Sequence, residues 1–155
     1  MKVAVISDTH GHTGRIIAYL DHEKENIDEI WHLGDYYNDF SLYSGIPVIA
    51  VRGNGDVGVN GPESLVIERM GHKVFLTHGH NYRVKQSLMQ LFYKGVEERF
   101  DLICFGHTHK PTNLYEEGVR LFNPGSPTHP YPSCAPTIGI IEFSDNGFCA
   151  KHIHL

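Results

Sequence analysis

Five apolar runs of this chain share one feature: each stops at a short polar motif. The first run, Val3-Ala4-Val5-Ile6, is continuous and mostly β-branched, which is typical of a strand buried on both faces of a sheet. The five predicted strands cover residues 3–6, 27–33, 47–51, 73–77 and 101–105. Buried strands of this kind need helices to cover the outer faces of their sheets, so the pattern predicts a layered α/β fold.

The five polar motifs all contain side chains that bind metal ions. They are Asp8-Thr9-His10, Gly34-Asp35, Gly53-Asn54, His78-Gly79-His80 and Gly106-His107-Thr108-His109. Ligands of open α/β sheets bind outside the carboxyl ends of the strands, so we expect the motifs to meet in one site. The set carries the argument, because a single His-x-His pair such as His152 and His154 also arises by chance on one face of a strand.

Oxygen and nitrogen donors together indicate which cations would bind. Carboxylate and amide oxygens with imidazole nitrogens suit manganese, iron, zinc, nickel or, less well, magnesium. Two such cations about 3.5–4 Å apart can clamp a phosphoryl group and lower the pKa of a shared water, which supplies hydroxide near neutral pH. Asp35 is a candidate to bridge them. The sequence therefore predicts a two-metal site, with manganese as the first expectation.

The remaining pattern predicts helices outside the sheets. Apolar residues at helical spacing predict a first helix of about three turns after residue 15 and a second over residues 83–98. Residues 36–44 are compatible with either a short helix or a loop. A hairpin is expected over residues 64–77, and further strands near residues 113–115, 119–122, 137–143 and 148–154. With no repeat or linker, residues 1–155 are expected to form a single domain of two packed sheets.

Composition excludes several classes of protein. Thirteen Lys and Arg against eighteen Asp and Glu give a formal charge of −5, which argues against binding of long nucleic acid. Three widely spaced cysteines do not form a disulfide framework and indicate a reducing compartment. The first apolar run meets Asp8 too soon for a signal peptide, and no run approaches the ~18 residues of a membrane span. We therefore expect a cytoplasmic protein without membrane partners.

In the order of its motifs the chain resembles the calcineurin-like metallophosphoesterases, specifically their YfcE-type phosphodiesterase branch. The resemblance spans nearly the whole chain and includes Asn123-Pro124-Gly125-Ser126 after the five motifs. It implies a four-layer αββα sandwich of two mixed β-sheets flanked by helices, and it is compatible with a homo-oligomer. It also implies two ligand sets: Asp8, His10, Asp35 and His109 for one metal, and Asp35, Asn54, His78 and His107 for the other.

The chain departs from this family at Gly55. Many members carry histidine after the motif asparagine and the YfcE branch often has cysteine, whereas glycine cannot donate a proton to a leaving group. We hypothesise that His12 approaches the leaving oxygen instead; the alternative is that His12 is a solvated loop histidine. The candidate catalytic residues are therefore Asp35, Asn54 and His12.

Four further features near the motifs have structural alternatives. Asp56 is expected to support the ligands or form a turn rather than bind metal. His80 could contact phosphate or support the metal ligands. The alternative is that it lies on the rim of the site without a functional role. For Arg52 a surface ion pair is favoured over a phosphate contact. The segment from Asn123 to Ser126 is expected to be a structural turn near the site.

These expectations describe a phosphoesterase that acts on a small phosphate ester. We expect a phosphodiesterase, in which a hydroxide bridging two metal ions attacks phosphorus in line. The same site would also serve a phosphomonoesterase or a nuclease. A third alternative is a catalytically weak, metal-binding scaffold for protein interactions, because the metallophosphoesterase-like subunit of retromer resembles this fold. The complete ligand set favours catalysis.

Overall fold

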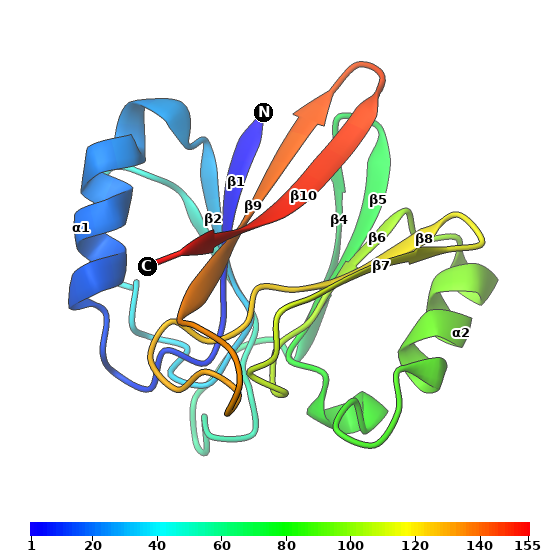
Figure 1. Ribbon diagram of the computed structural model, residues 1–155, viewed down its shortest axis with the longest axis horizontal. Helices are drawn as coiled ribbons and strands as arrows, with labels where there is room; N and C mark the ends of the chain where they lie inside the picture. The colour runs from blue at the N-terminus through cyan, green and yellow to red at the C-terminus, as the bar shows by residue number, and fades with distance from the viewer.

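Ten strands and two α-helices form the protein in the computed structural model, which describes residues 1–155 (Figure 1). The strands are β1 (Lys2–Ile6), β2 (Glu29–His32), β3 (Val48–Ala50), β4 (Ser64–Arg69), β5 (His72–Thr77), β6 (Leu102–Cys104), β7 (Thr112–Glu116), β8 (Val119–Asn123), β9 (Thr137–Ser144) and β10 (Gly147–His154). The α-helices are α1 (Gly14–Glu23) and α2 (Met89–Glu98), and η1 (Lys24–Asn26) and η2 (His80–Tyr82) are 3-10 helices.

The strands form two mixed sheets of five, in the orders β10-β9-β1-β2-β3 and β4-β5-β6-β8-β7. The first sheet contains the parallel strands β1, β2 and β3, and antiparallel β9 and β10 extend it. The second contains the parallel strands β5, β6 and β8, with antiparallel β4 and β7 at its edges. Each sheet therefore offers three parallel strands whose carboxyl ends open at one edge.

Three hydrophobic clusters separate four layers. The largest lies between the sheets and includes Val5 and Trp31 of the first sheet with Leu76, Cys104 and Phe122 of the second. A second cluster joins α1 to the outer face of the first sheet, and a third joins α2 to the outer face of the second. Burial of one such large side chain contributes about 1.5–3 kcal/mol, so these clusters fix the layers. The predicted four-layer αββα sandwich is confirmed (Figure 1).

The predicted helix over residues 83–98 is wrong in its first half, because α2 begins only at Met89. Arg83 has a φ of +51°, in the left-handed region, which a continuous α-helix cannot contain. Val84 is nevertheless buried and packs with Phe105, so its periodic spacing reflects burial by way of turns. Residues 36–44, the ambiguous segment, consist of turns and bends that place Phe40 in the cluster under α1.

The strand predictions are confirmed with small shifts of their ends. The strand expected over residues 27–33 is β2, and that over residues 47–51 is β3. The hairpin over residues 64–77 is present as β4 and β5. Neither α-helix has the length and apolar composition needed to cross a membrane.

Candidate metal centre

The five polar motifs meet where the carboxyl ends of the parallel strands of one sheet adjoin those of the other. Asp8 and His10 follow β1, Asp35 follows β2 and Asn54 follows β3. His78 follows β5, and His107 and His109 follow β6. Ligand atoms from Asp8, His10 and His109 lie within 4.8 Å of one another, as do those from Asp8, Asp35 and His78. The packing of the two sheets thus creates one cluster from residues as distant in the sequence as Asp8 and His109.

Asp8 lies at the centre of this cluster and has an unsatisfied oxygen. Its Oδ1 is buried without a hydrogen-bond partner, 3.2 Å from Nε2 of His109 and 3.9 Å from Nε2 of His78. Its other oxygen, Oδ2, accepts a hydrogen bond from the backbone N–H of His107. A buried carboxylate oxygen that faces imidazole nitrogens without a proper hydrogen bond is costly on its own. A cation among these atoms would satisfy it, so the residues fit a metal ion.

Backbone carbonyls orient two of the imidazoles for this role. His78 Nδ1 donates to the Leu33 carbonyl over 2.7 Å, and His109 Nδ1 donates to the His129 carbonyl. The proton on Nδ1 leaves the Nε2 lone pair of each ring free to bind a cation. Nε2 of His78 also lies 3.2 Å from Nδ1 of His107, a separation that allows both nitrogens to bind the same ion.

Asp35 faces the second group of donors. Its Oδ1 lies 3.5 Å from His78 Nε2 and accepts the backbone N–H of Gly55 over 2.8 Å. Gly53 passes so close that a Cβ there would lie 2.3 Å from this oxygen, so only glycine fits. Asn54, between these glycines, is exposed. Asp8 belongs to both groups of three donors, so the bridging role of Asp35 stays a prediction.

The surroundings of the cluster shift the pKa values of neighbouring residues in different directions. Burial raises the pKa of Asp8, but the nearby His109 ring and the charge of His78 hold it below its usual value. The contact with Asp8 raises the pKa of His109. Burial lowers the pKa of His10, and burial with the charges of His78 and Lys85 lowers the pKa of His107 to about 4. Charged Asp8 beside neutral His10 and His107 is the protonation state that binds a cation.

Five of the seven candidate ligands have positive φ angles. They are Asp8, His10, Asp35, His107 and His109, with φ between +48° and +66°. Aspartate and histidine tolerate this left-handed region better than most residues, yet it is disfavoured for any side chain. Residues held in sparsely populated conformations cluster at functional sites, where the surrounding structure determines them.

Side chains outside the ligand set stabilise the ligand loops through hydrogen bonds. Asp56 is buried and accepts the backbone N–H groups of Tyr36 and Tyr37 at 2.8 Å and of Gly53 at 2.7 Å, so it is a loop former as expected. Asn123 donates to the Gly106 carbonyl and to Thr108 Oγ1.

Ser126 and Thr128 both donate to the Asp8 carbonyl. The expected structural turn near the site is therefore confirmed, and it connects the loops after β1 and β6 through hydrogen bonds.

The remaining expected residues lie on the rim. His12 is exposed and donates from Nδ1 to the His10 carbonyl over 2.8 Å. His80 is partly buried beside His78 and His107, with ring centroids 5.5 and 6.2 Å away, and burial lowers its pKa. Arg52 forms an ion pair with Glu63 over 2.6 Å, as expected.

Sequence reasoning missed two histidines near the centre. His129 lies beside His10, with ring centroids 4.9 Å apart, and no local pattern marks it. His32 is fully buried in β2, and burial lowers its pKa to about 4. Thr9 donates to Asp39 over 2.6 Å, so His32 Nε2 is the donor in the 3.2 Å contact with Thr9. The only sequence signal that could have identified His32 was its position within a predicted apolar strand.

Comparison with known proteins gives the same assignment as the motifs. Residues 1–146 match the profile of the calcineurin-like phosphoesterase superfamily domain. The probable metallophosphoesterase YsnB of Bacillus subtilis is 31% identical over 126 residues, which cover 81% of this chain and 75% of that protein. Phosphodiesterase MJ0936 of Methanocaldococcus jannaschii is 28% identical over 92% of this chain and 93% of its own length.

Solved structures share the fold. A predicted phosphoesterase from Streptococcus pneumoniae superposes with a TM-score of 0.85 at 28% identity, over 99% of this chain and 88% of that chain. Vps29 of Entamoeba histolytica, solved in complex with zinc, superposes with a TM-score of 0.78 at 22% identity over 99% of both chains. The second likeness, at this low identity, concerns the fold alone.

Proposed function

Because the chain belongs to the calcineurin-like phosphoesterase superfamily, we propose that it is a metal-dependent phosphodiesterase acting at the cluster of strand-end ligands. One observation carries the proposal: Asp8, with a buried and unsatisfied oxygen, faces imidazole nitrogens from the opposite sheet. That arrangement leaves a negative, nitrogen-lined space suited to cations. A phosphodiesterase among the relatives, from Methanocaldococcus jannaschii, supports the diester over other phosphate esters.

The proposed ligand sets share Asp35. Asp8, His10, Asp35 and His109 would hold one cation, and Asp35, Asn54, His78 and His107 the other. When bound, the two cations would neutralise phosphate charge and supply hydroxide for in-line attack on phosphorus. The chain's own contribution is to hold the donors in place, through the carbonyls of Leu33 and His129 and through the buried Asp56 carboxylate.

The leaving oxygen needs a proton from a residue other than Gly55. We propose His12, whose Nδ1 proton is engaged by the His10 carbonyl. Nε2 is then the atom that carries a transferable proton in the imidazolium form. The exposed position of His12 beside a ligand supports access to the substrate.

We propose manganese as the metal. Mixed carboxylate, amide and imidazole donors without thiolate support it, and nickel, iron, zinc and magnesium are the alternatives. We further propose a small phosphate ester as substrate rather than long nucleic acid, since the net charge is −5. Three cysteines without a disulfide support a reducing, cytoplasmic location. A homo-oligomer remains part of the proposal.

The substitution Asp35→Asn tests the bridging role. An amide is a poor bridge between cations, so we expect the purified variant to lose at least one of two bound metal ions. We expect its hydrolysis of bis(p-nitrophenyl) phosphate to fall by at least ~100-fold, a size typical for loss of one key electrostatic group. Metal analysis and steady-state rates with added manganese measure both effects.

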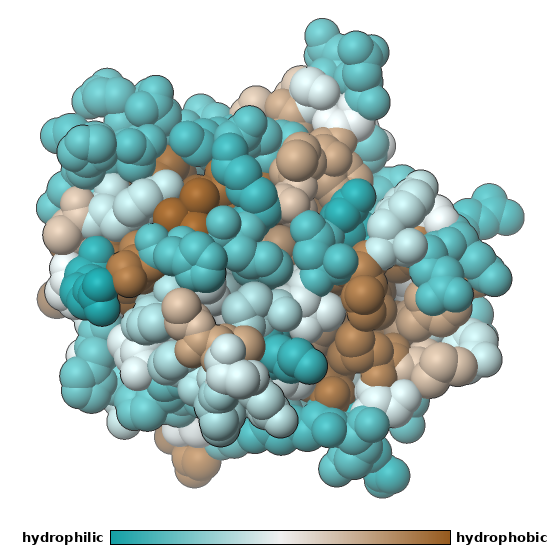
Figure 2. Space-filling model, viewed as in Figure 1, coloured by the Kyte–Doolittle hydropathy of each residue, from teal (hydrophilic) through white to brown (hydrophobic).

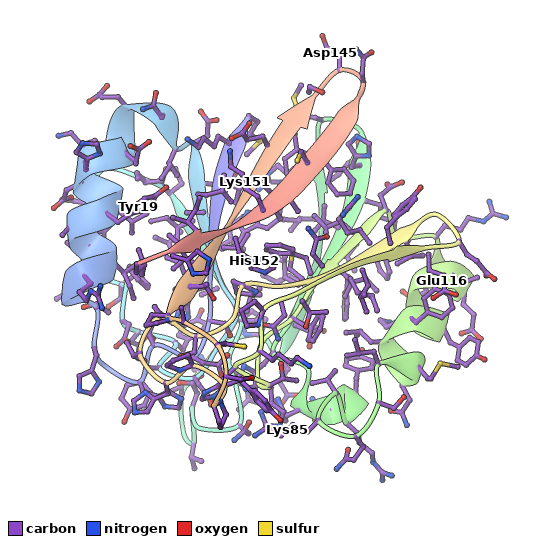
Figure 3. The ribbon with its side chains drawn as sticks, in the orientation of Figure 1. Tyr19, Lys85, Glu116, Asp145, Lys151 and His152 are labelled. Atoms are coloured by element: carbon purple, nitrogen blue, oxygen red, sulfur yellow. The ribbon has the colours of Figure 1, made fainter.

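Asp145→Asn is the matched control, because it makes the same chemical change at the exposed tip of the β9–β10 hairpin (Figure 3). Unchanged metal content and rate in Asp35→Asn would refute the bridge. A screen of monoesters, diesters and oligonucleotides separates the enzymatic alternatives. The likeness to Vps29 supports a second candidate, a protein-interaction scaffold, and full metal loading without turnover of any ester would favour it.

A further inference from the structure

A cavity of about 740 Å³ adjoins the candidate metal centre on the side of α2. Its wall includes Thr108, which lies between the candidate ligands His107 and His109. Tyr131, which also lines the cavity, donates its backbone N–H to the His109 carbonyl over 3.1 Å. The volume lies within the range of about 300–1,000 Å³ that is usual for small-molecule sites, which is more than a phosphate group alone occupies.

Part of the lining of this cavity is apolar. Val84, Leu88, Phe105 and Leu114 line it, and the hydrophobic surface between β7 and α2 is visible from outside (Figure 2). Tyr131 adds an aromatic wall that is about half exposed, at 47%. Apolar side chains with an aromatic ring favour a flat organic group.

The charged side chains that line the cavity are all positive. Lys85 and Lys110 line it, whereas no aspartate or glutamate does, although the chain as a whole is acidic. Neither lysine takes part in an ion pair. Lys110 Nζ lies 5.7 Å from the centre of the Tyr131 ring, so cation and aromatic wall are adjacent.

Lys85 lines the same cavity as Thr108, the residue between candidate ligands His107 and His109. It belongs to the segment that leads into α2 (Figure 3). A substrate whose phosphodiester lies at the metal ligands would therefore extend past Thr108 toward two cations.

We propose that this cavity binds the organic group of the substrate, and that Lys85 and Lys110 bind a second anionic group on it. The substrate class is a small phosphodiester with a flat, nucleoside-sized group that carries a further phosphate. The inference rests on the proposed function, because it assumes that the scissile phosphate lies at the metal centre.

Two esters that differ only in the second anion test the proposal. They are the p-nitrophenyl ester of thymidine 5′-phosphate and the same ester with a 3′-phosphate. In both, water supplies the oxygen that bonds to phosphorus, and p-nitrophenolate leaves with the electron pair of the broken P–O bond. With the manganese-loaded protein we expect the 3′-phosphate to raise kcat/KM about tenfold, mainly by lowering KM.

The double variant Lys85→Gln with Lys110→Gln should reduce this preference to about one, while kcat/KM for the plain ester changes less than about threefold. Lys24→Gln is the matched control, since Lys24 is exposed in η1, which directly follows α1, and α1 lies on the opposite side of the molecule from α2 (Figure 1). It removes the same charge and should keep the preference. Equal kcat/KM for the two esters, or a preference that survives the double variant, would overturn the inference and leave the phosphodiesterase proposal intact.

Binding gives a readout that does not depend on turnover. Thymidine 3′,5′-bisphosphate should bind about tenfold more tightly than thymidine 5′-phosphate in calorimetric titration, and the double variant should abolish the difference. If neither ester is hydrolysed, the phosphodiesterase proposal fails, and the titration still decides the cavity: equal affinities of the two nucleotides would refute it.

Discussion

Gly55 has no side chain that could donate a proton beside the candidate ligand Asn54, although its backbone N–H donates to Asp35 Oδ1. His12 is the rim histidine whose donor geometry is fixed by the His10 carbonyl. His129 lies close to it, with ring centroids 6.0 Å apart, so the two rings occupy the same side of the centre. A proton donor speeds hydrolysis only when the leaving oxygen must be protonated as it departs. The role of His12 can therefore be tested by comparing esters with different leaving groups.

We expect His12→Ala to slow hydrolysis of diesters with an alkoxide leaving group by about 100-fold or more, the size usual for a general acid. Esters of p-nitrophenol should be affected far less, because p-nitrophenolate departs without protonation. The pH–rate profile should lose the limb on which the rate falls as the acid deprotonates. His154→Ala, on the exposed end of β10, is the control. Unchanged turnover and an unchanged profile would rule His12 out.

At the scale of elements, the glycines of the two α-helices have opposite surroundings. A Cβ on Gly95 of α2 would lie 2.6 Å from Val119 Cγ1 and 3.1 Å from Ile103 Cδ1, both in the sheet beneath. Gly14, at the start of α1, has no atom within 4 Å of such a Cβ. The close approach of α2 to β8 therefore depends on Gly95, whereas α1 has no such need.

Gly95→Ala should lower the free energy of unfolding by about 1–3 kcal/mol, because overpacking against a stiff, buried valine outweighs the better helix propensity of alanine. Gly14→Ala should raise it by up to about 1 kcal/mol. Urea unfolding of both variants, followed by circular dichroism, measures the pair. Stabilisation by both substitutions would contradict the packing of α2 described above.

On the scale of the whole molecule, the candidate ligands come from both sheets. Asp8, His10 and Asp35 follow strands of the first sheet, and His78 and His109 follow strands of the second. Cations bound among them would connect the sheets at the edge opened by the parallel strands. We also propose that residues 1–155 unfold as one domain, since the cluster between the sheets takes residues from both.

Removal of metal should therefore lower the Tm of the whole protein in a single transition. A ligand that binds only the native state at 100 times its Kd contributes about 2.7 kcal/mol. Calorimetric scans with excess manganese and with a chelator measure the difference, and Asp35→Asn should reduce it. A Tm independent of manganese would exclude manganese binding to the native state, and two separate transitions would argue against one domain.

The amino-acid sequence by itself determined where the strands lie along the chain and which residues are candidate ligands. Apolar runs such as residues 3–6 are local signals, and the polar motif at the end of each run is legible without a partner. The fold class followed from these signals. The start of α2 did not, because the spacing of Val84 and Leu88 is that of a helix while the left-handed Arg83 interrupts it.

Only the tertiary structure decided how the ligands meet. The left-handed backbone at Asp8 and Asp35 is held by hydrogen bonds and packing from distant segments, which no local propensity encodes. His129 reaches His10 because Ser126 and Thr128 bind the loop after β1. The cavity with Lys85 and Lys110 likewise needs two segments that are separate in sequence. Local pattern specifies which side chains are available, and long-range contacts, whose energy depends on the packed sheets, specify where they point.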